Sequence, residues 1–166
     1  MTEAGGPRAA DYATQFEAAQ QEFIRLVESL TDEHWGRIGR NHPKRINEED
    51  EGRSVGVIAH HVAISGPFII DRIQGMLAGR PLAPVDFRIG NAKHAEEHAG
   101  VTRESVLDLL RTTQPQIAAA VRAMPDSQLD QSRDTPAGPM SVAQRLERVL
   151  IGHLEGHRAS IEAAIS

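Results

Sequence analysis

The chain has 166 residues, the size of one globular domain with a hydrophobic core of its own. Its 18 Lys and Arg residues and 23 Asp and Glu residues give a net charge of −5, and the two signs are interspersed along the sequence. These charges argue against a nucleic-acid-binding surface. The absence of cysteine excludes a disulfide framework and a thiolate nucleophile supplied by the protein, and it suits a reducing compartment.

The longest apolar stretch, Val55–Leu77, does not have the composition of a membrane span. It is interrupted by His60, His61, Asp71 and Arg72, so a buried helix is expected there instead. The N-terminal sequence MTEAGGPRAADY lacks a basic segment followed by an apolar one, which a secretory signal requires. We therefore expect a cytoplasmic protein with neither nucleic-acid nor membrane partners.

Helical periodicity, broken only by proline and glycine, runs along the chain. Neither sustained alternation of apolar and polar residues nor a tight turn between β-branched runs is present, so strands are not expected. The sequence predicts an all-α bundle that forms one domain over residues 1–166, with residues 1–8 flexible. The predicted helices begin and end at about residues 9–30, 54–79, 89–99 and 102–123, and a last helix begins at Ser141.

Local signals mark where three of these helices begin. Ser54 and Thr102 are suitable N-caps, and Ser141 with Gln144 has the spacing of a reciprocal capping box. Pro67 removes one backbone hydrogen bond inside the second helix and should bend it. Two connecting segments are predicted as loops: residues 134–140, and the polar residues 36–52, which we expect to form a crossover loop near the functional site.

The last helix carries the clearest chemical signal, a pair of histidines one turn apart. Counting about 100° per residue from Val142 places His153 and His157 inside one apolar arc. Two inward imidazoles without an ion need two separate hydrogen-bonding partners, whereas one divalent cation satisfies both. The spacing therefore predicts a metal site, although a core histidine satisfied by a hydrogen bond is the alternative for each residue alone.

A third ligand has to come from another helix, and the second helix offers two adjacent histidines. On the helical wheel, His61 lies just beyond the edge of the apolar stripe, while His60 points nearly opposite. The spacing favours His61, and it leaves a surface or supporting role open for either residue.

Two other metal-binding patterns do not fit their context in the sequence. His94-Ala-Glu-Glu97-His98 matches the H-x-x-E-H pattern of inverted zinc metallopeptidases. On a helix, His94 and His98 lie opposite the side that carries Ile89 and alanines, so both are expected to be solvated. A di-iron bundle is excluded because leucine, not glutamate, stands three residues before each histidine of the last helix.

The order of these motifs resembles the DinB/YfiT-like superfamily. The resemblance rests on Ser54-Val-x-x-Ile-x-x-His61 in the first half and His153-x-x-x-His157 in the last helix. It also includes the Asp32-Glu-His-Trp35 segment and Asn91 followed by Thr-Arg-Glu-Ser-Val-Leu, and it extends over residues 9–165. One departure is Arg53, which stands where many relatives have tryptophan.

The resemblance implies a four-helix bundle with a long crossover connection and an additional short helix. It implies a divalent first-row metal ion held by His61, His153 and His157, with zinc expected first and nickel or iron as alternatives. Homodimerisation is implied as well. Several branches of this superfamily, including mycothiol-dependent maleylpyruvate isomerase and bacillithiol transferase, are thiol-dependent transferases or isomerases.

Three functional hypotheses follow for this chain. The first is a metal-dependent enzyme that uses a low-molecular-weight thiol, such as mycothiol, bacillithiol or glutathione, to transfer sulfur to a small-molecule substrate or to isomerise it. The second is a hydrolase in which the same ion activates water. The third is a non-catalytic, stress-related binding protein. Asn91 and the 36–52 loop are the residues expected to line a pocket.

Overall fold

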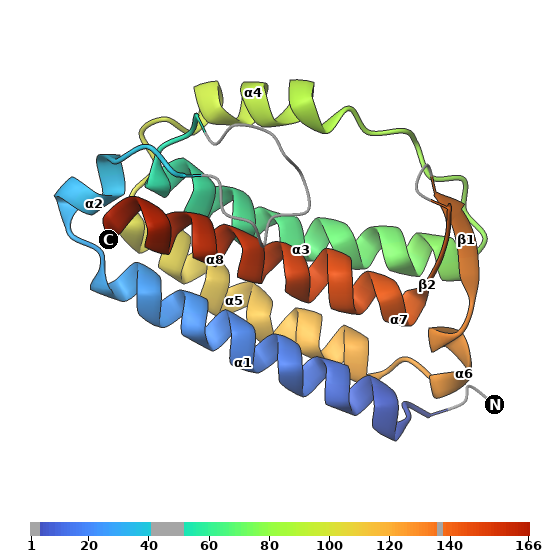
Figure 1. The fold of residues 1–166 in the computed structure, drawn as a ribbon. Helices are drawn as coiled ribbons and strands as arrows, with labels where there is room; N and C mark the ends of the chain where they lie inside the picture. The colour runs from blue at the N-terminus through green and yellow to red at the C-terminus, as the bar shows by residue number, and fades with distance from the viewer. Residues whose placement is uncertain (1–3, 41–51, 136–137) are drawn as a thin grey trace.

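Four long helical segments pack into a bundle (Figure 1) in the computed structural model, which describes residues 4–40, 52–135 and 138–166. They are α1 (Pro7–Ser29), α3 (Val55–Leu77), α5 (Arg103–Arg122) and a C-terminal helix made of α7 (Val142–Gln144), the π-helical segment η1 (Arg145–Ile151) and α8 (Gly152–Ile165). The shorter elements are α2 (Asp32–Gly36), α4 (Phe87–Glu97), α6 (Asp126–Leu129), β1 (Ser132–Thr135) and β2 (Gly138–Ser141). The predicted helical bundle is confirmed.

The order of the four helices around the bundle differs from their order in the chain. α1 packs mainly against α5 and the C-terminal helix, and α3 packs against the same two. α1 and α3 therefore occupy opposite corners, so the connection between them crosses the bundle. α3 and α5 run in the same direction, and α4 lies on the long connection between them (Figure 1). The long crossover and the additional short helix are both confirmed.

The core is made by the apolar stripes that the helical periodicity predicts. Each stripe removes large side chains from water, which contributes roughly 25 cal/mol for every Å² of apolar surface buried. Large side chains that are almost completely buried come from all four long helical segments: Phe16, Phe23, Ile58, Ile73, Leu110, Leu146 and Ile161.

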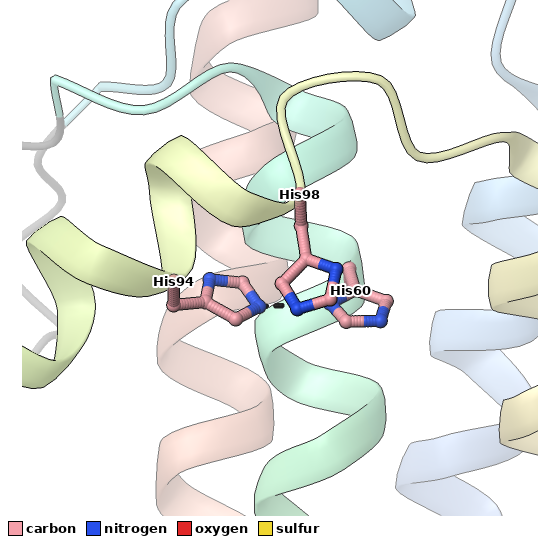
Figure 2. Close-up of side chains that lie close together, drawn as sticks. All are labelled: His60, His94 and His98. Atoms are coloured by element: carbon pink, nitrogen blue, oxygen red, sulfur yellow. Dashed lines mark hydrogen bonds between the residues drawn. The ribbon is translucent and has the colours of Figure 1, made fainter.

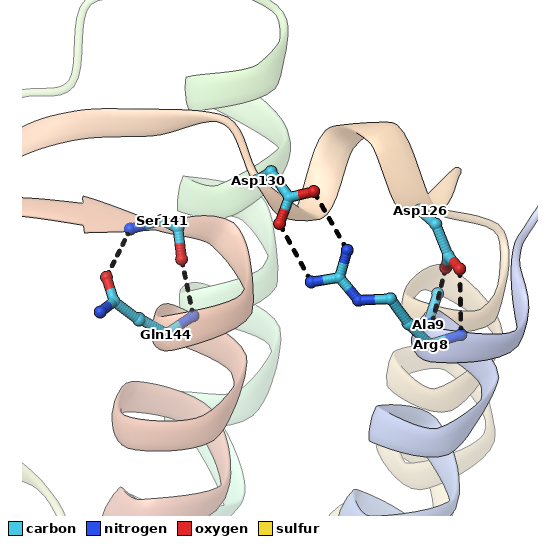
Figure 3. Close-up of polar contacts among 6 residues, drawn as sticks. All are labelled: Arg8, Ala9, Asp126, Asp130, Ser141 and Gln144. Atoms are coloured by element: carbon cyan, nitrogen blue, oxygen red, sulfur yellow. Dashed lines mark hydrogen bonds and ion pairs between the residues drawn. The ribbon is translucent and has the colours of Figure 1, made fainter.

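The predicted starts of three helices are confirmed by their capping hydrogen bonds. The Ser54 hydroxyl accepts a hydrogen bond from the Val57 amide at 3.3 Å, and the Thr102 hydroxyl does the same for α5. At the start of the C-terminal helix (Figure 3), the Ser141 hydroxyl accepts from the Gln144 amide at 3.1 Å, while the Gln144 side chain accepts from the Ser141 amide at 2.9 Å. The caps of α3 and of the C-terminal helix fix the starting points of two helices that carry histidines.

The N-terminus of α1 is capped by a residue far away in the chain. The Asp126 carboxylate of α6 accepts hydrogen bonds from the backbone amides of Arg8 and Ala9 at 3.2 and 3.1 Å, and the Arg8 side chain pairs with Asp130 at 3.0 Å (Figure 3). A negative charge at this end also interacts favourably with the helix dipole. Of residues 1–8, predicted as flexible, residues 1–3 lie outside the described residues, whereas Pro7 and Arg8 belong to α1.

The prediction that residues 134–140 form only a loop is wrong. β1 and β2 pair as an antiparallel hairpin, in register from Ser132 opposite Ser141 to Thr135 opposite Gly138. Neither strand has the alternation of β-branched or aromatic residues with polar residues that makes a strand recognisable in a sequence. The two strands pair where the chain reverses direction between α6 and α7. Gly138 adopts a φ of +100°, a conformation that glycine tolerates and other residues rarely adopt.

The polar segment predicted as a crossover loop lies mostly outside the described residues, which omit 41–51. Its described ends are joined by backbone hydrogen bonds from the Gly39 amide to the Arg53 carbonyl at 2.9 Å and from the Val55 amide to the Arg37 carbonyl at 2.8 Å. Its relation to the functional site stays a prediction. Among the described helices, none is both long and apolar enough to cross a membrane.

Trp35 of α2 lies against the start of α3, and its indole N–H donates to the carbonyl of Val101, just before α5, at 2.9 Å. A Cβ atom at Gly56 would lie only 2.5 Å from the Trp35 Nε1 atom, so Gly56 is the residue that lets the indole lie against α3.

We expect Gly56→Ala to lower the free energy of unfolding by about 1–3 kcal/mol because the added methyl must displace the Trp35 ring. Urea denaturation of the metal-free proteins measures this loss. Gly90→Ala in α4 is the matched control, since a Cβ at that position meets nothing within 4 Å and alanine favours the helix. Equal stability of the two variants would contradict the packing role of Gly56.

Candidate metal centre

The three histidines predicted as metal ligands lie together between α3 and α8. His61 comes from α3, and His153 and His157 come from α8; one ring nitrogen from each lies within 4.8 Å of the other two. The Nε2 atoms of His61 and His153 are 3.0 Å apart, and the centroids of the His153 and His157 rings are 4.5 Å apart. We call these three residues the α8 triad.

The π-helical segment η1 sets how the two histidines of α8 face the bundle. Because η1 has wider turns than an α-helix, a wheel counted at 100° per residue from Val142 loses its phase before it reaches α8. His157 is buried, with 5% of its surface exposed, as the wheel predicts, whereas His153 is only half-buried. The pair therefore spans the boundary between the core and a more accessible region.

The donor set of the α8 triad fits a first-row divalent cation. Imidazole nitrogens bind zinc at about 2.0–2.1 Å, which places two ligands of a tetrahedral site roughly 3.3 Å apart. Side-chain adjustments of about an ångström would bring the three nitrogens into that arrangement. Imidazoles suit zinc, nickel and iron rather than calcium or magnesium, which prefer oxygen ligands.

Within the described ranges, no Cys, Asp, Glu or fourth His belongs to the α8 triad. Three neutral protein ligands leave at least one coordination position of a bound ion available, which is the layout of catalytic zinc sites rather than structural ones.

A second group of three histidines lies beside the first (Figure 2). His60 of α3 faces His94 of α4 and His98, the residue that directly follows α4, and one ring nitrogen from each lies within 4.8 Å of the other two. The Nδ1 atom of His60 and the Nε2 atom of His94 are hydrogen-bonded at 2.8 Å. The ring centroids of His60 and His98 are 4.1 Å apart. We call these residues the α4 triad.

The prediction that His94 and His98 are solvated is wrong. Only 8% of the His94 surface is exposed and His98 is half-buried, whereas Ile89 on the same helix is 63% exposed. A helical wheel shows which residues share a side of a helix but not which side faces the protein. In α4 the apolar side consists mainly of alanine, which buries too little surface to decide the orientation.

Burial and neighbouring positive charge favour the neutral imidazoles of His94 and His60. Burial lowers the pKa of His94 to about 4, and the nearby His60, His98 and Arg53 act in the same direction against a smaller opposite effect of Glu97. Burial also lowers the pKa of His60, with a contribution from His98. A neutral imidazole is the form that binds a metal ion.

The two triads meet at the consecutive residues His60 and His61 of α3. The ring centroids of His61 and His94 are 5.8 Å apart. Sequence reasoning missed this second group, although His94 and His98 have the same i, i+4 spacing as His153 and His157.

Asn91, predicted to line a pocket, is half-buried on α4, one turn before His94, and its pocket role stays a prediction.

A pair of half-buried arginines lies farther along the same two helices. Arg72 is on α3 and Arg145 is on η1; the pKa of Arg145 is lowered by burial and by the charge of Arg72. The Arg145 Nε atom is buried and finds no hydrogen-bond acceptor in the described part of the chain. Arg72 is eleven residues after His61, or about 16 Å along the helix axis. Two like charges without a carboxylate would suit an anionic group.

Comparison with known proteins places this chain in a family. A family model described as the DinB superfamily matches residues 15–161, nearly the whole chain. The chain belongs to the DinB superfamily. A search of curated proteins finds no match. The membership confirms the resemblance expected from the Ser-Val-x-x-Ile-x-x-His and His-x-x-x-His motifs.

The fold of this DinB superfamily protein is similar to that of YfiT from Bacillus subtilis. The two structures superimpose with a TM-score of 0.72 at 19% sequence identity, over 94% of this chain and 85% of YfiT. YfiT is described as a probable metal-dependent hydrolase with an unusual four-helix bundle topology. At this identity the similarity shows the shared fold, and the crossed helix order described above agrees with it.

Proposed function

We propose that this DinB superfamily protein is a metal-dependent enzyme that joins a low-molecular-weight thiol, through its sulfur, to a small-molecule substrate or uses the thiol to isomerise that substrate. The observation that carries the proposal is the α8 triad: imidazole nitrogens of His61, His153 and His157 lie within 4.8 Å of one another. Three imidazole ligands are the donor set of catalytic zinc sites, in which a further coordination position takes water or substrate.

A divalent ion, zinc in the first instance, would supply Lewis acidity and lower the pKa of a thiol or a water molecule that it meets. The protein's own contribution is to present three neutral donors from two packed helices. Because the chain contains no cysteine, a sulfur nucleophile has to come from a cofactor.

Arg72 and Arg145 support an anionic thiol in particular. They lie on the same two helical segments as the α8 triad, and neither is paired with a carboxylate in the described contacts. A thiol whose acidic group binds these guanidinium groups would extend along the α3 and C-terminal helices toward the histidines.

The test is a thiol-conjugation screen on zinc-loaded protein with mycothiol, bacillithiol and glutathione against a panel of electrophilic small molecules. We expect product only when both the metal and a thiol are present, and loss of product after chelation. Elemental analysis of the same sample measures the metal content. Turnover without any added thiol, or equal turnover after the ion has been removed, would contradict the proposal.

A metal-dependent hydrolase is the second candidate, favoured by the description of YfiT. It would use the same three histidines, with water in place of the thiol. Hydrolysis of an ester or amide panel at a rate independent of added thiol would select this function. If neither panel reacts although the ion binds at the α8 triad, a binding protein is the remaining hypothesis.

Homodimerisation, which the family resemblance implies, and a cytoplasmic location, which the sequence composition suggests, remain predictions. Light scattering on the purified full chain tests the first directly.

A further inference from the structure

We propose that His60, His94 and His98 form a second site for a divalent first-row cation such as zinc, separate from the α8 triad. The proposal does not depend on the proposed enzymatic function, because it concerns residues outside the site that carries it.

The geometry of the α4 triad meets the first requirement for a metal site as well as the α8 triad does. In both groups, three imidazole nitrogens from two elements lie within 4.8 Å of one another. The 2.8 Å separation of His60 Nδ1 and His94 Nε2 is slightly shorter than the spacing of two ligands around a tetrahedral zinc ion, so the rings need only a small outward movement to admit one. Figure 2 shows the three rings converging from α3 and α4.

Hydrogen bonding within the protein does not fully satisfy the α4 triad. The bond between His60 and His94 uses one nitrogen of each ring, whereas the Nδ1 atom of His94 is buried and has no hydrogen-bond partner in the described parts of the chain. Whichever tautomer His94 adopts, a buried polar atom stays unpaired, which is costly and uncommon in folded proteins. The group is therefore not explained as a self-contained hydrogen-bonded cluster.

The attachment of α4 to the bundle gives a second, independent reason. His94 is the one buried residue of α4, while Phe87 and Ile89 are 55% and 63% exposed. A helix normally docks by burying an apolar stripe, and α4 buries a histidine instead. A cation held by His60 on one side and by His94 and His98 on the other would join α4 to α3 and supply the binding energy that the apolar residues do not provide.

The two triads have the same kind of donor, so the test counts the bound ions in variants that each lack two histidines of one triad. Metal-free protein is titrated with zinc, and bound zinc is measured by calorimetry and by elemental analysis after gel filtration. We expect two zinc ions per chain in the wild type and one each in His94→Ala/His98→Ala and His153→Ala/His157→Ala. The variant with all four substitutions is expected to bind none. Glu96→Gln, an exposed position on α4, is the matched control and should keep both ions.

Hydrogen exchange shows where the ion binds, and it provides a second test if one of the paired variants folds poorly. In the His153→Ala/His157→Ala protein, zinc should slow exchange of the Phe87–Glu97 amides, and adding His98→Ala, which changes only a half-buried residue, should abolish that protection. One zinc ion in the wild type, two ions retained by His94→Ala/His98→Ala, or loss of both ions from either pair variant would each overturn the proposal. Unchanged exchange of α4 on adding zinc would do the same. A failure of this site leaves the ion count at the α8 triad, and with it the proposed function, untouched.

Discussion

Replacing His153 and His157 together by alanine is expected to remove the ion from the α8 triad and to lower activity by at least about 100-fold. Changes to groups that merely support a ligand already cost up to about 100-fold in affinity or activity, and this change removes two of the three ligands. Both side chains come from one turn of α8, so His61 would be left as a single imidazole with negligible affinity. Elemental analysis and the thiol-conjugation rate measure the two effects.

The measurement is cleanest in protein that already carries His94→Ala and His98→Ala, since any ion of the α4 triad is then absent. Glu155→Gln is the matched control, because Glu155 lies between the two histidines on α8 but is exposed to solvent. Circular dichroism of the metal-free variants checks whether the bundle still folds with the cavity that alanine leaves at the buried position of His157. Zinc retained at full occupancy by the double variant would refute the assignment of the ligands.

The second large effect is expected on the stability of the metal-free protein at acid pH. In the folded state the pKa of His94 is lowered from 6.5 to about 4, so the folded protein holds this imidazole neutral while the unfolded chain protonates it below about pH 6.5. The contribution of His94 to the free energy of unfolding is therefore fully present above pH 6.5, decreases as the pH falls toward 4, and is constant below pH 4. At 1.36 kcal/mol per pKa unit, the loss amounts to roughly 3 kcal/mol.

Urea denaturation of wild type and His94→Gln, both with chelator present, isolates this contribution from that of the acidic side chains. The difference in unfolding free energy between the two proteins should shrink or reverse as the pH is lowered from 6.5 to 4, because glutamine does not titrate. Parallel pH profiles would mean that His94 is readily protonated in the folded protein.

Much of the fold could be predicted from local sequence because the relevant interactions are local. Ser54, Thr102 and the Ser141–Gln144 box cap helices in the structure as predicted, since a capping side chain needs only the amides two or three residues ahead of it. The apolar stripes were recognisable for the same reason: the 3.6-residue period follows from backbone geometry alone. The pairing of His153 with His157 is a local property of this kind.

Features that depend on contacts distant in the chain were predicted less well. The β1–β2 hairpin has no strand-like composition, and it forms where α6 and α7 oblige the chain to reverse. The π-helical segment η1 has the same apolar pattern as an α-helix, so this pattern does not predict the partial exposure of His153. Both are cases in which packing of neighbouring elements overrides a local preference.

Helix period and capping are encoded residue by residue, so the amino-acid sequence is enough to predict a helical bundle whose last helix carries two histidines one turn apart in its apolar seam. Which other histidines lie beside them depends on long-range packing. His60 and His61 are adjacent in the chain but point to different neighbours, one to α4 and the other to α8. α4 buries His94 rather than Ile89, and this orientation depends on how the helix lies against α3. The apolar pattern of the 11 residues of α4 does not specify the orientation.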